Sequence, residues 1–186
     1  NRTEQRRFDI RVTKQPIHVF YFGDDYSVAS GVPMNSYVST FYADGKPAEC
    51  EVELKASIED EDKFRSVSKV RTNSYGVARL RMMRPDIGDP DDDLDFKITA
   101  KDKDGRTGTW SNDISFDADK AAVRLTADRS IYKPGETMNI SIVSTKRSGP
   151  VFLDVVKNWS VVDSRFAQLK NGKANITVPY SDSFKG

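Results

Sequence analysis

Apolar and polar residues alternate with a period of two along most of the chain, and Gly, Pro, Asn and Asp interrupt the alternation at short intervals. No window of about 11 residues or more carries apolar positions at helical spacing. A period of two places successive side chains on opposite faces of a strand. The sequence therefore predicts an all-β protein. The candidate strands of the first part of the chain are residues 17–22, 35–42, 49–58, 64–71, 77–83, 94–101 and 107–116.

Seven short strands within about a hundred residues match the size and rhythm of one antiparallel immunoglobulin-like or fibronectin-like sandwich. A displacement of 104 residues then brings a second set of signals into coincidence with the first. With a loop about eight residues shorter in the second copy, Gly76 and Ala78 fall on Gly172 and Ala174. The residues that coincide at the full displacement are Gly31, Met34, Asn35, Val38 and Gly45 with Gly135, Met138, Asn139, Ile142 and Gly149.

The repeat predicts tandem seven-stranded sandwiches, the last of them incomplete. Residues 1–14 are interpreted as the terminal strand of a preceding sandwich, residues 15–117 as a complete sandwich, and residues 118–186 as the first five strands of another. A sandwich without its last strands leaves unpaired edges and an uncovered core. We therefore expect either that a part was removed or that a strand is supplied by another copy, with residues 3–12 as the candidate donor.

Composition and charge exclude several classes of function. The formal net charge is +1, which gives no general attraction to nucleic acid. No apolar run approaches the roughly 18 residues of a membrane span. The polar start, Asn1-Arg-Thr-Glu-Gln-Arg-Arg7, lacks the features of a signal peptide, so we expect an internal fragment of a longer protein.

The residue types needed for catalysis are scarce. Cys50 is the only cysteine, so the chain can form no internal disulfide and no multi-cysteine zinc site. It stands between Glu49 and Glu51, whose charges would raise a thiol pKa, and it is interpreted as a small structural residue. His18 is the only histidine and occupies a half-exposed strand position. No catalytic residue and no enzymatic activity are predicted.

One acidic loop and two tryptophans have alternative interpretations. Oxygen-rich loops of this kind can bind Ca²⁺ between sandwich domains, but the spacing does not match an EF-hand and a solvated turn is preferred. Calcium is the only cofactor that the sequence leaves open. Trp110 and Trp159 are placed on strands and assigned to core or interdomain packing. The carboxylates of the loop are Asp86, Asp89, Asp91, Asp92, Asp93 and Asp95.

The most specific motif is Asp128-Arg-Ser-Ile-Tyr-Lys-Pro-Gly-Glu-Thr137, followed by an alternating strand. It resembles the entry to a macroglobulin-like domain of the α2-macroglobulin family, where a Tyr-x-Pro-Gly-Glu turn joins the first two strands. The segment Asp25-Tyr-Ser-Val-Ala-Ser-Gly-Val-Pro33 is a looser form in the first copy. Further resemblance lies in Phe41-Tyr-Ala-Asp-Gly-Lys-Pro-Ala48 and in Thr72-Asn-Ser-Tyr-Gly-Val-Ala-Arg-Leu80.

This resemblance implies a non-catalytic scaffold module of a broad protease inhibitor that traps endopeptidases. Cys50 is followed by Glu51 and Val52, which does not fit the Cys-Gly-Glu-Gln thioester of the family. The scarcity of cysteine is more similar to bacterial members, which implies an extracytoplasmic, periplasmic or secreted location with a membrane anchor elsewhere in the protein. The implied partners are neighbouring domains and target proteases. The alternative is a calcium-stabilised immunoglobulin-like repeat of a bacterial surface or adhesion protein.

Overall fold

The computed structural model describes residues 4–7, 12–23, 27–59, 61 and 63–184 of the chain. Its strands confirm the all-β fold, and the only helical segment described is the 3-10 helix η1, Asp182–Phe184. The chain divides into two compact units. The first comprises Asn1–Val28 with Met34–Ser115, and the second comprises Ala29–Pro33 with Phe116–Gly186.

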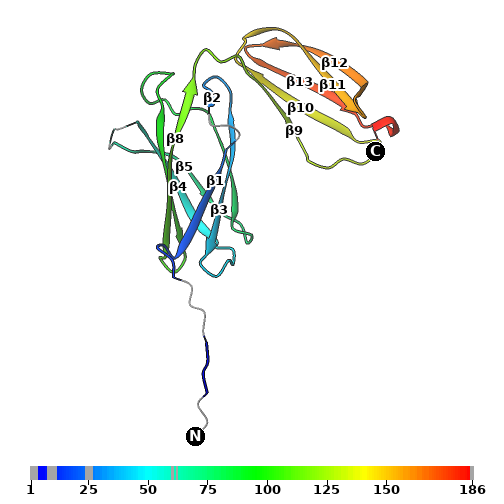
Figure 1. Cartoon of the computed structure of the whole chain (residues 1–186). Coiled ribbons are helices and arrows are strands. Elements are labelled where there is room, and N and C mark those ends of the chain that lie inside the picture. Colours follow the sequence, from blue (N-terminus) through cyan, green and yellow to red (C-terminus); the bar gives the residue numbers. More distant parts are fainter. Residues whose placement is uncertain (1–3, 8–11, 24–26, 60, 62, 185–186) are drawn as a thin grey trace. The chain divides into compact units, whose positions relative to one another are not determined.

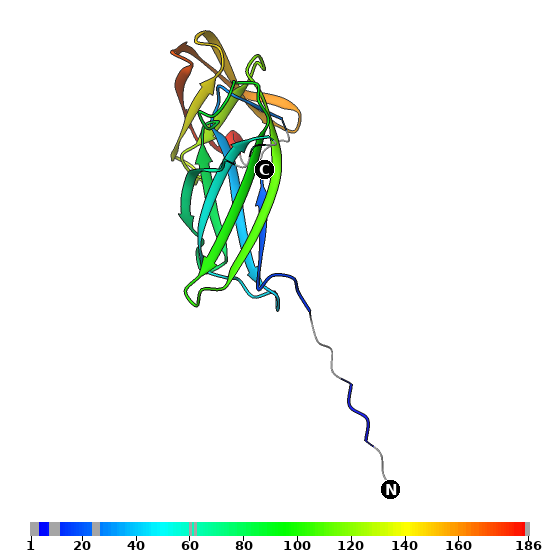
Figure 2. The same cartoon turned by 90° about the vertical axis from the view of Figure 1, so that its left-hand side faces the viewer.

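The first unit contains two sheets (Figure 1, and at right angles Figure 2). The three-stranded sheet has the order β1-β3-β6, and the five-stranded sheet has the order β2-β8-β7-β4-β5. The bounds of the strands are β1 Ile17–Phe22, β2 Ser27–Ala29, β3 Met34–Tyr42, β4 Cys50–Ile58, β5 Arg65–Arg71, β6 Val77–Met82, β7 Leu94–Asp102 and β8 Thr107–Asp117.

The core of the first unit follows from the alternation in its strands. In β7 the even-numbered residues from Leu94 to Asp102 are buried, whereas the odd-numbered ones are exposed or half-buried, with Lys97 and Lys101 exposed. One face of each strand therefore enters the core, as a period of two requires. The largest fully buried side chains of this unit are Phe96, Ile17, Leu54, Leu80, Leu94 and Ile98.

The predicted strands of the first unit lie within one residue of the observed ones at each end. The exception is β2, which the sequence analysis did not predict. It is only three residues long and gives no measurable alternation, and it forms a strand because β8 offers it an edge in the five-stranded sheet. Short edge strands of this kind are defined by their neighbour rather than by their own propensity.

The second unit forms one antiparallel sheet with the strand order β11-β12-β13-β10-β9. Its fully buried core is small and consists of Ile142, Leu169, Ile176 and Val178, with partly buried apolar side chains around it. The bounds of its strands are β9 Val123–Ala127, β10 Thr137–Ser144, β11 Ser148–Lys157, β12 Ser160–Lys170 and β13 Lys173–Pro179.

The strand register of the two units is the same under the displacement read from the sequence. β9-β10-β13 of the second unit are paired as β1-β3-β6 are in the first, with 104 residues between equivalents in the first two strands and 96 in the third. The difference of eight residues is the shorter loop. The equivalent pairs are Val19↔Thr40 with Val123↔Ser144, and Val38↔Ala78 with Ile142↔Ala174.

The two units differ in how well the equivalent apolar face is covered. Val19 is 7% exposed in the first unit, whereas its equivalent Val123 is 56% exposed in the second. In the first unit, β4 pairs with β7, and both strands belong with β8 to the second, five-stranded sheet. Within the described part of the second unit, β11 pairs only with β12 and no second sheet is present.

The interpretation of residues 1–14 as a last strand stays a prediction. Residues 1–3 and 8–11 lie outside the described residues, and the described residues 4–7 and 12–14 are not in a strand. The proposed strand exchange through residues 3–12 falls largely on the same undescribed positions. The predicted boundary after residue 117 lies two residues from the division between Ser115 and Phe116.

Candidate functional site

The two side chains most often used in nucleophilic catalysis are not brought together. Cys50 lies in β4 of the five-stranded sheet, and burial is the main cause that raises the pKa of its thiol. His18 lies in β1 of the other sheet, where its Nε2 is 3.1 Å from Thr13 Oγ1. A nucleophile and its base must be within hydrogen-bond reach. Among the described residues these two make no such contact.

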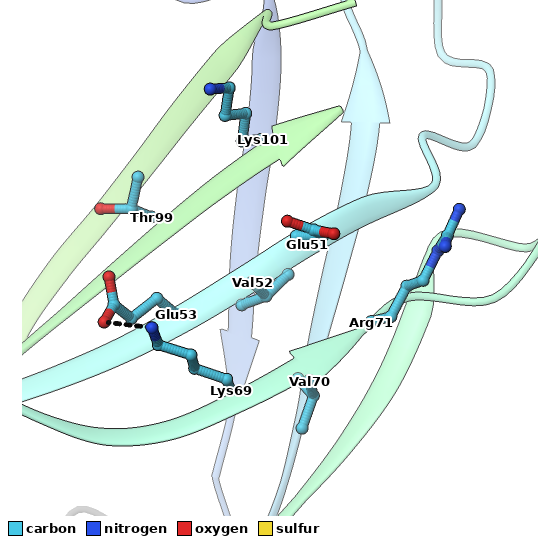
Figure 3. A pocket seen from close by; sticks show the side chains of 8 residues that line it. All are labelled: Glu51, Val52, Glu53, Lys69, Val70, Arg71, Thr99 and Lys101. Atoms are coloured by element: carbon cyan, nitrogen blue, oxygen red, sulfur yellow. Dashed lines mark ion pairs between the residues drawn. The ribbon is translucent and has the colours of Figure 1, made fainter. Parts of the chain in front are cut away.

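An open pocket of about 580 Å³ lies over β4, β5 and β7 of the first unit (Figure 3). Glu53 Oε atoms are 3.5 Å from both Lys55 Nζ and Lys69 Nζ. A hydrogen bond from Ser66 is the main reason why the pKa of Glu53 is lowered. Such exposed pairs contribute little free energy, so this surface is a solvated ladder of charges. Its lining residues are Glu51, Val52, Glu53, Lys69, Val70, Arg71, Thr99 and Lys101.

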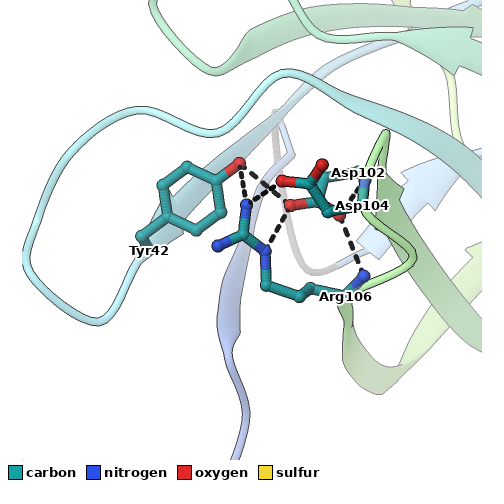
Figure 4. A network of polar contacts seen from close by, with 4 residues as sticks. All are labelled: Tyr42, Asp102, Asp104 and Arg106. Carbon is teal, nitrogen blue, oxygen red and sulfur yellow. Dashed lines mark hydrogen bonds and ion pairs between the residues drawn. The ribbon is translucent and has the colours of Figure 1, made fainter.

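A second polar cluster joins the β7–β8 turn to the end of β3 (Figure 4). The fully buried side chain of Asp102 accepts hydrogen bonds from Arg106 Nε at 2.7 Å and from the Tyr42 hydroxyl at 3.0 Å. It also accepts from the backbone N–H groups of Asp104 at 3.0 Å and Arg106 at 2.9 Å. The Arg106 guanidinium lies 4.5 Å from the centre of the Tyr42 ring.

The Asp102 carboxylate is kept ionised by its hydrogen-bond donors. Burial acts to raise its pKa, but the hydrogen bonds from Arg106 and Tyr42 outweigh burial and hold the pKa below the usual range. Four donors occupy its two oxygens, which leaves little capacity to accept a proton from a substrate. The cluster therefore connects the two sheets of the first unit.

The motif that resembles a macroglobulin entry forms a closed network in the second unit. The Tyr132 hydroxyl donates to the Asp128 carboxylate, which also accepts from the backbone N–H and the side-chain amide of Asn139 at 3.1 and 3.0 Å. Arg129 Nη1 lies 3.1 Å from Glu136 Oε1, and the N–H of Lys133 donates to Glu136 Oε2 at 2.7 Å. The side chains of Asp128, Arg129, Tyr132 and Glu136 thus stabilise the loop between β9 and β10.

Removing the Tyr132 hydroxyl tests the role of this network through pH. The hydrogen bond from Tyr132 is the main cause that lowers the pKa of Asp128, so ionised Asp128 stabilises the fold. A carboxyl with a lowered pKa contributes stability above its unfolded value of about 4, and this contribution is lost as the pH falls. In far-UV circular dichroism, Tyr132→Phe should lower the unfolding midpoint of the second unit at pH 7, and this loss should become smaller as the pH falls from 4 toward 2.

The matched control for this prediction is Tyr180→Phe. The Tyr180 ring contacts Phe184 at 5.6 Å between centroids, and its hydroxyl has no hydrogen-bond partner among the described residues. We expect no pH-dependent change in this variant. An equal loss in Tyr132→Phe at pH 7 and pH 2 would contradict a role of the ionised carboxylate.

The six carboxylates of the candidate calcium loop are not arranged as a metal site. No group of three or more His, Cys, Asp or Glu among the described residues has the geometry to hold a metal ion. The Arg84 guanidinium donates to the backbone carbonyls of Pro85 at 3.0 Å, Asp92 at 3.3 Å and Asp89. Asp92 Oδ2 accepts from the N–H of Asp89 at 2.7 Å, and Asp93 Oδ1 accepts from the Ser115 hydroxyl at 2.8 Å.

The Arg84 guanidinium therefore places a positive charge within this loop and binds three of its backbone carbonyl oxygens. The other members of the predicted set are the exposed Asp86 and Asp91 and the half-buried Asp95 at the start of β7. Calcium binding through this loop stays a hypothesis that rests on the sequence alone. We expect the thermal unfolding midpoint to be the same in about 5 mM CaCl₂ and in EDTA, because a Ca²⁺ site needs six to eight oxygen ligands. A midpoint that rises with calcium would contradict this expectation.

The two tryptophans have different environments. Trp110 in β8 stacks on Tyr21, with ring centroids 4.8 Å apart. Trp159 lies in the turn between β11 and β12 and is fully exposed, so the predicted strand position and core packing are wrong for it, whereas interdomain packing stays a prediction. Hairpin alternation in the sequence continues through this turn without Gly or Pro, which is why the turn was not recognised.

No protein-family model matches the sequence, and no curated protein matches it. Among solved structures, the chain is similar to native α2-macroglobulin of Escherichia coli, with 12% identity, a TM-score of 0.43, and coverage of 91% of this chain and 15% of that one. It is also similar to the elastase-activated form of the Escherichia coli protein, with 12% identity, a TM-score of 0.46, and coverage of 89% and 19%.

A third similar structure is a tetra-tandem repeat from the extending region of a large adhesion protein. Here the identity is 15%, the TM-score is 0.43, and the coverage is 91% of this chain and 42% of that one. The chain thus spans about 15% of the length of the first similar structure. Similarity at this level assigns neither a family nor a function. In the part of the chain that is described, no helix has the length and apolar character needed to cross a membrane.

Proposed function

We propose that the chain is a non-catalytic scaffold module of a protein of the α2-macroglobulin type that inhibits proteases. The observation that carries the proposal is the network within Asp128-Arg-Ser-Ile-Tyr-Lys-Pro-Gly-Glu136. In this motif, which resembles the family in sequence, the Asp, Tyr, Arg and Glu side chains all stabilise the loop that leads from β9 into β10.

The use of the other polar clusters supports a scaffold role. Asp102 and Arg106 anchor a turn, Arg84 closes the acidic loop, and Cys50 is buried with a raised thiol pKa. An active site keeps polar groups available and aims them at a substrate. In the described residues, these clusters instead satisfy one another or the backbone.

The proposal includes location and partners. We place the module in the periplasm or outside the cell, within a longer protein that is anchored to a membrane elsewhere, and we assign contacts with target proteases to the whole protein. Neighbouring domains of the parent chain are the direct partners of this module. A chain with one cysteine and no internal disulfide must obtain its stability from apolar cores in any compartment.

The test uses the parent polypeptide and this chain in parallel. The gene on both sides of this segment is read for a Cys-Gly-Glu-Gln type sequence, and both proteins are treated with trypsin while released thiols and covalent protease adducts are measured. We expect a new thiol and an adduct from the parent and neither from this chain. A parent that has similar sandwiches to its end, a surface anchor and no thiol release would overturn the inhibitor and favour an adhesion protein.

A further inference from the structure

The outer face of the three-stranded sheet β1-β3-β6 in the first unit carries exposed aromatic side chains. Ile17 and Val19 of β1 are buried in the core, so the alternate side chains of this strand point outward. Phe20 is 47% exposed and Phe22 is 56% exposed, with ring centroids 6.5 Å apart. Phe41, on the strand β3 that lies beside β1 in Figure 1, is 6.4 Å from Phe20 between centroids. We name Phe20, Phe22, Tyr37, Phe41, Arg79 and Arg81 together the aromatic–arginine face.

Two exposed arginines of β6 border the aromatic side chains. Tyr37 is the cross-strand partner of Phe22 on one side and of Arg79 on the other, so the three form one row across the sheet. Arg79 Nη2 donates to Asn35 Oδ1 at 2.9 Å, and in the described part of the chain neither Arg79 nor Arg81 belongs to an ion pair. The three strands contain no Asp or Glu. The strands that form this face therefore carry positive charge without a matching carboxylate.

The second unit shows that the fold does not require such a face. Its sheet β9-β10-β13 is paired in the same register, and Ser141, the equivalent of Tyr37, has Thr126 and Asn175 as cross-strand partners. Because a row of polar side chains forms the same sheet, pairing of the strands does not explain the aromatic and arginine side chains of the first unit. All six equivalent positions are polar: Phe20 falls on Arg124, Phe22 on Thr126, Tyr37 on Ser141, Phe41 on Thr145, Arg79 on Asn175 and Arg81 on Thr177.

The chemistry of the aromatic–arginine face favours a protein partner over a sugar. Aromatic and arginine side chains are the types that are enriched at protein interfaces and among their most important contacts. Phe20, Phe22 and Phe41 offer no hydrogen-bonding groups, so the hydroxyl groups of a sugar ring would lose water there without finding partners. An apolar side chain of a protein pays no such cost. The unpaired arginines select carboxylates beside that side chain.

We propose that the aromatic–arginine face binds an extended segment of a separate protein in which apolar side chains alternate with carboxylates. Alternate residues of an extended segment are about 6.7 Å apart, and successive side chains point to opposite sides. Phe20 and Phe22 are two residues apart within β1, and Arg79 and Arg81 are two residues apart within β6, so both pairs have this spacing. A segment along the boundary between β3 and β6 places its apolar side chains over the rings. Its carboxylates then reach the guanidinium groups, each of which can donate two hydrogen bonds to a carboxylate.

The mixture of rings and unpaired charges indicates a reversible contact. Permanent interfaces are more hydrophobic and resemble a domain core, with few charged residues at their centre. Here the rings are only half exposed, and Arg79 and Arg81 lie in water beside them. The arginines keep the face soluble while it is empty, as a partner that associates and dissociates requires. We therefore expect a dissociation constant on the order of 100 μM for a short segment.

The experiment measures fluorescence anisotropy of the peptide acetyl-Glu-Leu-Glu-Val-Glu-Leu-Glu-amide, carrying a neutral fluorophore, with the whole chain at about 1 to 500 μM. One control peptide has Lys in place of every Glu, and another has Ser in place of Leu and Val. Both should bind at least about tenfold more weakly, because one lacks the carboxylates and the other the apolar side chains. Raising NaCl from about 50 to 500 mM should weaken binding of the first peptide through screening of its charges.

Substitutions in the chain replace residues of the face by those that the second unit carries. Phe22→Thr and Arg81→Thr should each raise the dissociation constant at least about fivefold, as expected for anchor residues. Two matched controls remove the same residue types elsewhere: Phe166→Thr on β12 and Arg71→Thr on β5, both exposed. Neither should change the dissociation constant. Circular dichroism confirms that each variant is folded.

Several outcomes overturn the proposal. They are no binding up to about 500 μM, equal binding of the lysine peptide, or equal losses in Arg71→Thr and Arg81→Thr, which would place the contact on the charge ladder. Binding of phosphatidylserine vesicles or oligogalacturonate through Arg81, without binding of the peptide, would identify a membrane or a polysaccharide instead. Peptide binding by this chain but not by the parent protein would show that a neighbouring domain covers the face.

The acidic residues nearest in sequence to the face are also tested. Asp24 and Asp25 follow β1 and lie outside the described residues. The double variant Asp24→Asn with Asp25→Asn should bind the acidic peptide at least as tightly as the wild type, because it removes only like charge. Weaker binding in this variant would contradict recognition of carboxylates by the arginines.

Discussion

Replacement of Gly76 by alanine is expected to destabilise the first unit by roughly 3 kcal/mol, which is in the upper part of the usual range for single substitutions. Gly76 has a φ of 71°, and a Cβ atom there would lie 2.3 Å from the carbonyl oxygen of Thr40. The same turn is held by a hydrogen bond from the N–H of Thr40 to the Gly76 carbonyl at 2.8 Å. Relief of the clash must therefore break the contact between β3 and this turn.

The matched control is Gly45→Ala. Gly45 has a φ of 85°, but a Cβ atom there meets nothing within 4 Å, so only the left-handed backbone costs free energy, about 1 kcal/mol. Urea unfolding followed by Trp110 fluorescence reports on the first unit, because the exposed Trp159 is already in water. Equal losses of unfolding free energy in the two variants would show that the Thr40 carbonyl oxygen does not clash with a Cβ atom on residue 76.

Asp102→Ala is expected to lower the free energy of unfolding of the first unit by about 3 kcal/mol at pH 7. The substitution leaves the Tyr42 hydroxyl, Arg106 Nε and two backbone N–H groups without their acceptor, and hydrogen bonds to a charged partner contribute about 1.5–3 kcal/mol each before rearrangement. In the variant, exposed donors such as Arg106 form hydrogen bonds with water instead. The total loss of stability is therefore well below the sum of the four hydrogen bonds.

Both a control variant and pH separate this effect from a general loss of charge. Asp104 also pairs with Arg106, at 2.7 Å, but its side chain is 55% exposed, so Asp104→Ala should cost less than about 1 kcal/mol. Because the pKa of Asp102 is lowered in the fold, its contribution is present above the unfolded value of about 4 and is lost at lower pH. The difference between the wild type and Asp102→Ala should thus narrow in acid, and a constant difference would contradict the ionic role.

The repeat was the most informative feature of the sequence, and its structural consequence is visible in single residue pairs. Val38 falls on Ile142, and Ala78 falls on Ala174. Val38 is the cross-strand partner of Ala78, and Ile142 is the cross-strand partner of Ala174, so the two units share this register. The turn glycines Gly76 and Gly172 likewise accept from the N–H groups of Thr40 and Ser144, each at 2.8 Å. Sequence could predict these matches because apolar alternation and turn glycines are local signals.

The polar clusters could not be predicted in the same way. Asp102 carries no local signal in the sequence, because its burial depends on Tyr42, which is 60 residues away in the chain. The acidic loop was open to a calcium interpretation because the sequence does not show that Arg84 points into it. Trp159 was assigned to a strand since nothing local distinguishes an Asn-Trp turn from a continuing strand.

The sequence by itself determined the all-β class, the repeat and the strand positions of the first unit apart from β2, because these depend on local alternation and on residues with special backbone freedom. Only the tertiary structure decided which faces are covered. Val19 and Val123 are the same amino acid at equivalent positions, yet one is buried and the other is exposed. Burial is a property of what lies opposite a side chain, and in the described second unit no second sheet lies opposite this face.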